Sequence, residues 1–161
     1  MKGLLGILPW AIVLVLGGSV IWVLLDGQMA AGRWLLAGVL IAHGLVHALF
    51  LVPAPATGTG GREWPFDLGR SWPVTKASLD PGLARLIATF LIVVIAGAFA
   101  LAALATLGLV VPSGWWGSLV VIGAVASLVL LVLAFDPQLV LGIGIDIALL
   151  VVVFGSFWSP P

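Results

Sequence analysis

Three ionisable side chains lie in the middle of long apolar segments: His43, His47 and Asp146. An ionisable group inside a membrane span is costly, and it commonly faces the protein interior and marks an ion or proton pathway. The histidines are four residues apart, so a helix would place both imidazoles on one face, one turn apart. These three residues are therefore the leading candidates for binding or chemistry.

The depth of each residue in its span predicts that the three side chains meet. His43 and His47 lie ten and six residues from the proline that ends their apolar run, and Asp146 lies eight residues from the glutamine before its own run. With a rise of about 1.5 Å per residue, the carboxylate falls between the two imidazoles in depth. Gly44 and Gly142 adjoin these faces and would allow close helix approach. We expect the two helices to pack with Asp146 against His43 and His47.

Several kinds of site fit this set of side chains. Two histidines and a carboxylate are ligand types for zinc or another transition metal, which makes His43, His47 and Asp146 a candidate metal site. A protonatable cluster could instead couple proton movement to transport. A structural role is also open, since a lone aspartate at the centre of a span costs about 2.5–3.5 kcal/mol and requires a partner. The sequence requires no cofactor.

Two further residues are outer candidates for the same cluster. Arg85 and Thr89 share a face at the start of the third apolar run. Thr89 is predicted to lie near His47 in depth. Both are therefore kept as possible outer members.

The elements that position these residues follow from the composition, which is 63% apolar and only 7% charged. A soluble domain is about 45–50% apolar and about 25% charged, so lipid must solvate most of this chain. A span needs about 17–25 apolar residues. We predict one all-α domain over residues 1–161, a helical bundle with five transmembrane spans at about 4–25, 34–52, 83–110, 116–135 and 139–158.

The first span has a second interpretation, a cleaved signal peptide cut near residues 30–32. A signal core is about 7–15 apolar residues long, and this run exceeds twenty. We expect a retained helix.

Basic residues and tryptophans indicate the same orientation. With the N-terminus in the cytoplasm, only Arg33 lies outside, and the loop 53–81 is cytoplasmic; the bases on the inner side are Lys2, Arg62, Arg70, Lys76 and Arg85. Tryptophans favour the headgroup layer, and five fall at predicted outer helix ends: Trp22, Trp34, Trp115, Trp116 and Trp158. We predict an N-in, C-out topology.

The loop and the third span each carry a compositional signal. Trp64, Phe66 and Trp72 alternate with charges, which suits either an anchor on the membrane surface or a lid over the histidine end of the bundle. The third span is rich in alanine at three- and four-residue spacing, which lets helix backbones approach closely. We expect that helix to be central.

Other classes of function are disfavoured. The chain has no cysteine, which excludes disulfides, thiol catalysis and Cys-ligated metals. Its formal net charge is zero, so it has no basic field for nucleic acid. The glycines of residues 58–73 do not form a phosphate-binding motif, and no inverted pair of broken helices is visible.

The stretch Ala42-His43-Gly44-Leu45-Val46-His47, the Trp-Pro pairs of the loop and the acidic residue of the last span carry a resemblance. With them the chain resembles small, functionally uncharacterised polytopic bacterial membrane proteins with H-G-x-x-H in an early helix. The resemblance implies a bacterial cytoplasmic membrane and no particular reaction.

These observations favour a small multi-pass membrane protein with a binding, accessory or permease-like role rather than an enzyme. Its partners would be the lipid bilayer and either another membrane protein or further copies of itself. The alternative is a proton- or metal-ion-handling protein that uses His43, His47 and Asp146.

Overall fold

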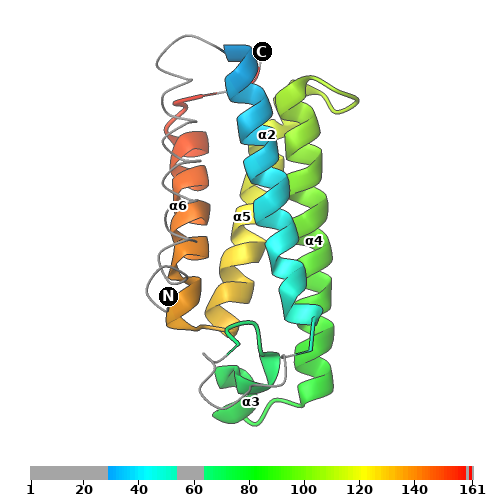
Figure 1. Cartoon of the computed structure of the whole chain (residues 1–161), viewed down its shortest axis with the longest axis vertical. Helices are drawn as coiled ribbons and strands as arrows, with labels where there is room; N and C mark the ends of the chain where they lie inside the picture. Colours follow the sequence, from blue (N-terminus) through cyan, green and yellow to red (C-terminus); the bar gives the residue numbers. More distant parts are fainter. Residues whose placement is uncertain (1–28, 54–63, 159, 161) are drawn as a thin grey trace, which may run out of the picture.

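The computed structural model describes residues 29–53, 64–158 and 160, and the regular structure of these residues is entirely helical (Figure 1). The all-α prediction is therefore confirmed for this part of the chain. A 3-10 turn, His47–Leu51, extends the first described helix, and shorter ones precede the last two. The α-helices are α2 (Met29–Val46), α3 (Trp72–Thr75), α4 (Pro81–Leu107), α5 (Trp116–Leu133) and α6 (Val140–Phe154).

Four helical segments of the described chain are long and apolar enough to cross a membrane: Ala30–Leu51, Pro81–Leu107, Ser113–Leu133 and Pro137–Phe154. Each overlaps one of the last four predicted spans, as expected of a membrane protein. The first predicted span, 4–25, lies outside the described residues. A total of five spans therefore stays a prediction.

The two ends of α4 are set by individual residues rather than by the limits of the apolar run. Asp80 caps the start, where its carboxylate accepts the backbone N–H of Leu83 at 2.9 Å. At the other end Gly108 adopts the left-handed conformation, with φ at 68°. The helix stops at Leu107, short of the predicted end at residue 110, because the backbone turns away at this glycine.

The alanine-rich helix α4 packs against α2 on one side and α5 on another, and α6 packs on α5. The central place expected for α4 is therefore shared with α5, which has α4 and α6 as neighbours. In Figure 1, α4 and α6 lie on opposite sides of the bundle. One of the alanine series expected from the sequence is buried along α4: Ala98, Ala102 and Ala105.

Phe99 sets the spacing of three helices. It is fully buried on α4 and touches glycines of both neighbouring helices. A Cβ atom on Gly123 of α5 would lie 2.9 Å from its ring, and one on Gly44 of α2 would lie 3.3 Å from its Cβ. The two glycines therefore make room for one aromatic ring between α2 and α5.

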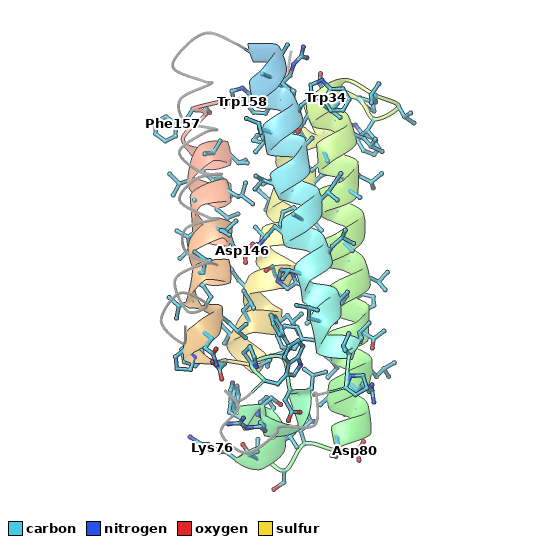
Figure 2. The ribbon with its side chains drawn as sticks, in the orientation of Figure 1. Trp34, Lys76, Asp80, Asp146, Phe157 and Trp158 are labelled. Carbon is cyan, nitrogen blue, oxygen red and sulfur yellow. The ribbon has the colours of Figure 1, made fainter. Side chains whose placement is uncertain are left out.

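The described part of the polar loop, from Trp64 onward, folds against one end of the bundle. Phe66 meets Phe50 edge to face, with ring centroids 5.1 Å apart, and the indole N–H of Trp72 donates to the carbonyl of Val132 at 2.9 Å. Figure 2 shows Lys76 and Asp80 at this end, and Trp34 and Trp158 at the opposite end. We name residues 64–80 the end segment.

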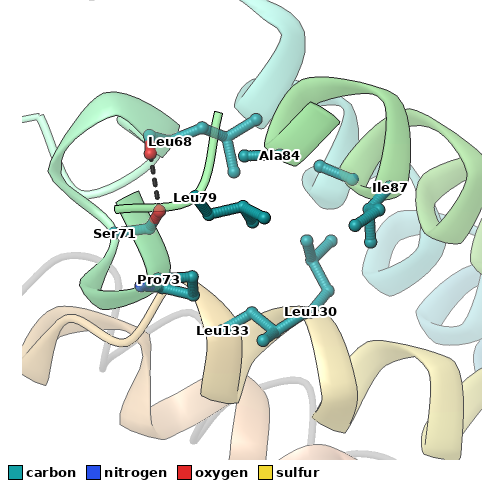
Figure 3. Close-up of a pocket in the computed structure, with 9 residues that line it drawn as sticks. Leu68, Ser71, Pro73, Leu79, Ala84, Ile87, Leu130 and Leu133 are labelled. Atoms are coloured by element: carbon teal, nitrogen blue, oxygen red, sulfur yellow. Dashed lines mark hydrogen bonds between the residues drawn. The ribbon is translucent and has the colours of Figure 1, made fainter. Parts of the chain in front are cut away.

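A small cavity of about 60 Å³ lies between the end segment and helices α4 and α5 (Figure 3). Its walls are almost entirely apolar, and the hydroxyl of Ser71 is already donated to the carbonyl of Leu68 at 2.7 Å. Such a space has room for about two water molecules and offers them almost no polar surface. It is a packing gap rather than a ligand site.

Candidate functional site

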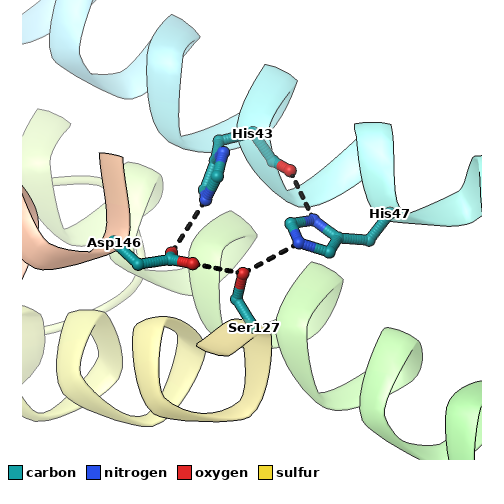
Figure 4. Close-up of polar contacts among 4 residues, drawn as sticks. All are labelled: His43, His47, Ser127 and Asp146. Atoms are coloured by element: carbon teal, nitrogen blue, oxygen red, sulfur yellow. Dashed lines mark hydrogen bonds and ion pairs between the residues drawn. The ribbon is translucent and has the colours of Figure 1, made fainter. Parts of the chain in front are cut away.

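The aspartate of the last helix and a histidine of the first described helix meet inside the bundle. The Nε2 atom of His43 lies 2.8 Å from Oδ1 of Asp146, and the side chains are 4% and 0% exposed respectively. The approach of Asp146 to this histidine, expected from their similar depth, is confirmed. Figure 4 shows the pair bridging α2 and α6.

Ser127 of α5 completes the site and was not among the sequence candidates. Its hydroxyl donates to Oδ2 of Asp146 at 2.5 Å, and the same oxygen lies 2.8 Å from Nε2 of His47. His47 therefore joins Asp146 through Ser127 rather than directly. We call His43, His47, Ser127 and Asp146 the buried network.

The depth comparison would have identified Ser127 had it included hydroxyl groups. Ser127 lies eight residues before Phe135, the predicted end of its span, and Asp146 lies eight residues after Gln138. The two ends adjoin in the chain, so the two side chains share one depth. A neutral hydroxyl was overlooked because it is much cheaper to bury than an ionised group.

His47 lies at the point where α2 changes to a 3-10 turn. Its Nδ1 atom is 2.8 Å from the backbone carbonyl oxygen of His43. A carbonyl can only accept, so Nδ1 must carry the hydrogen of this bond. This contact fixes the ring with Nε2 directed at Ser127.

Helix α4 contributes an apolar wall. The ring of Phe99 lies 5.3 Å from the ring of His43, centroid to centroid, and the two imidazoles are 5.1 Å apart at nearly a right angle. Every one of the four long described helices therefore has a side chain in or against the buried network. The wall lowers the local dielectric, which strengthens each bond of the network.

The network needs one more hydrogen than its uncharged histidines, serine and ionised aspartate supply. It has four hydrogen bonds, and each needs one hydrogen. Neutral His43, neutral His47 and Ser127 provide one each, and an ionised Asp146 provides none. All four bonds form only when one additional proton is bound.

That additional proton has two positions that satisfy every bond. If His47 carries it, Nε2–H donates to Ser127, and Ser127 donates to the carboxylate of Asp146. If Asp146 carries it, the carboxyl donates to Ser127, and Ser127 donates to Nε2 of His47. The site is neutral overall in both arrangements, which suits a region surrounded by hydrocarbon.

The metal interpretation receives no geometric support from the part of the chain that the structure describes. No group of three or more His, Asp or Glu side chains there is arranged to hold a metal ion. His43 and Asp146 are hydrogen-bonded directly to each other, and both nitrogens of His47 have other partners. A shared ion would require these contacts to be broken.

Arg85 and Thr89 are not brought into the network. The hydroxyl of Thr89 donates to the carbonyl of Arg85 at 2.8 Å, within α4 itself. Arg85 is exposed and lines a cavity of about 250 Å³ at the end segment, together with Phe50 and Asp67. Among the described residues, no hydrogen bond joins either outer candidate to the four side chains of the site.

The glycines expected to bring the two site helices together face other helices instead. Gly44 faces Phe99 and Ala96 of α4, and Gly142 faces Leu131 of α5. Helices α2 and α6 make few backbone contacts. The prediction that these glycines let α2 and α6 pack closely is therefore wrong. The side chains of His43 and Asp146 span the distance between α2 and α6 instead.

Comparison with family models, curated proteins and solved structures gives no match, so the interpretation of the site depends on its own geometry.

Proposed function

We propose that the protein binds a proton within the membrane and conducts it through the buried network. The single observation that carries this proposal is the hydrogen count: three bonds among four buried side chains, with the bond from His47 to the backbone carbonyl of His43, require one proton beyond those of the uncharged histidines and serine. A site that is fully bonded only when protonated is a proton-binding site.

The donor set favours a proton over a larger cation. A metal or alkali ion needs several free lone pairs directed at one point. Here the lone pairs of the carboxylate, the hydroxyl and Nε2 of His47 are directed at one another across distances of 2.5–2.8 Å. Only a hydrogen fits between atoms that close.

The same proposal includes the setting of the site. We place the protein in a bacterial cytoplasmic membrane with the N-terminus and the end segment on the inner side, because Arg70, Lys76 and Arg85 gather at that end. A permease-like or accessory role, alone or with a membrane partner, would then use the proton as its coupling ion.

Proton flux into vesicles tests the proposal. The purified chain is reconstituted in liposomes that contain a pH-sensitive dye, and a potassium diffusion potential drives protons inward. We expect faster acidification than in empty vesicles, and the Asp146→Asn variant should return to the empty-vesicle rate. Asparagine keeps the hydrogen-bonding pattern of a protonated aspartate but cannot release a proton.

Thr106→Val is the matched control. Thr106 is fully buried on α4, and its hydroxyl donates to the carbonyl of Ala102 within the helix. This variant should conduct as the wild type does. Equal rates for the wild type and Asp146→Asn would overturn the proposed function and leave the network a structural one.

A further inference from the structure

We infer that the hydroxyl of Ser127 is the relay that moves the proton between Asp146 and His47. This inference rests on the proposed function and names the residue through which it works. Among the described contacts, Ser127 is the only link between the carboxyl group and His47, since Asp146 bonds directly to His43 and to Ser127.

The geometry of the link suits a relay. One oxygen atom, Oγ of Ser127, is 2.5 Å from Oδ2 of Asp146 and 2.8 Å from Nε2 of His47. Both distances are those of formed hydrogen bonds, so a proton can move along each without displacement of heavy atoms. The residue is 0% exposed, which keeps solvent from supplying a competing path.

The transfer balances as two coupled proton shifts. The Oδ2–H bond of Asp146 breaks as a new O–H bond forms on Ser127, and the original O–H bond of Ser127 breaks as an N–H bond forms at Nε2 of His47. Asp146 becomes a carboxylate, Ser127 remains a neutral hydroxyl, and His47 becomes an imidazolium. The hydroxyl reverses its direction, and no other reactant is needed.

Hydrogen bonds stabilise both charged groups that this transfer produces, the carboxylate and the imidazolium. After it, the carboxylate of Asp146 still accepts from His43, and the imidazolium of His47 donates from Nδ1 to the carbonyl of His43 and from Nε2 to Ser127. Phe99 is the ring of α4 against His43. Within the described chain, no other titratable or charged side chain is hydrogen-bonded to the four members.

Nitrogen-15 NMR of histidine-labelled protein tests the relay without measuring flux. The chain has two histidines, and a His43→Gln variant assigns their signals. We expect Nε2 of His47 in the wild type to report an average of protonated and bare nitrogen. In Ser127→Ala it should report the bare nitrogen alone, because the path from Asp146 is cut. Ser127→Thr keeps the hydroxyl and should restore the averaged signal.

Two results would overturn the relay. One is an identical Nε2 signal of His47 in the wild type and in Asp146→Asn, which would mean that no proton from Asp146 reaches His47. The other is an averaged signal that persists in Ser127→Ala. If the vesicles show no proton flux while the NMR signals behave as expected, the relay exists and transmembrane conduction fails, so the two proposals are tested separately.

Discussion

At the scale of the residue, the site is defined by how its polar groups satisfy one another. Depth along each span was sufficient to pair Asp146 with His43, because both are ionisable groups that lipid excludes. It did not reveal Ser127, whose neutral hydroxyl gives a weak signal in an apolar sequence. The route to His47 through that hydroxyl depends on side-chain direction, which residue spacing does not specify.

Two substitutions of Asp146 separate its hydrogen bonds from its charge. Asp146→Leu leaves the N–H of His43 without its carboxyl partner, at a cost of about 1–3 kcal/mol for this buried group, while Ser127 keeps His47 as its remaining partner. Asp146→Asn retains an acceptor for His43 and a donor for Ser127, so its free energy of unfolding should lie within about 1 kcal/mol of the wild type.

Thermal unfolding in detergent, followed by circular dichroism, measures both effects. We expect a clearly lower Tm for the leucine variant and a nearly unchanged Tm for the asparagine variant. A leucine variant as stable as the wild type would contradict the view that the buried network holds the bundle together.

At the scale of the element, apolar run length predicted the described spans because bilayer thickness fixes how many residues a helix needs. The ends of α4 followed instead from Asp80 and Gly108, which act through backbone hydrogen bonds and conformation. The packing order α2, α4, α5 and α6 was not predictable from the sequence. A helix that is apolar on every side has no amphipathic pattern that identifies the helix packed against it.

The contact between α4 and α5 depends on the absence of a side chain at Gly123. In Gly123→Ala the new Cβ would lie 2.9 Å from the ring of Phe99, which must shift or push the helices apart. Overpacking of this kind costs about 1–3 kcal/mol, measurable as a lower Tm.

Gly97→Ala on α4 is the control for this substitution, since no described atom lies within 4 Å of its added Cβ. The change should be neutral or stabilising by up to about 1 kcal/mol, because alanine is the better helix former. If the two variants unfold at the same temperature, the close fit of Phe99 against α5 does not limit stability.

At the scale of the whole molecule, the two ends of the bundle differ in chemistry. Lys76 of the end segment and Arg85, near the start of α4, lie at one end, and Arg33 and Trp34, near the start of α2, lie at the other. This distribution predicts which end faces the cytoplasm, because translocation disfavours basic residues.

The absence of cysteine makes the predicted orientation directly measurable. A membrane-impermeant maleimide applied to intact cells should label Gly114→Cys, in the turn before α5, but not Ala77→Cys in the end segment. Permeabilised cells should allow both to react. Neither substitution changes a charge, so each leaves the basis of the orientation intact. The reverse labelling pattern would show that the topology is C-in.

The order of the buried network along the chain has a consequence for biosynthesis. Every side-chain partner of Asp146 in the network precedes it: His43 by 103 positions and Ser127 by 19. Because a nascent chain emerges from its N-terminal side, both partners are made before the segment with the acidic group leaves the translocon. That segment can dock on a prepared surface as it enters the lipid, and the aspartate need not cross the bilayer alone.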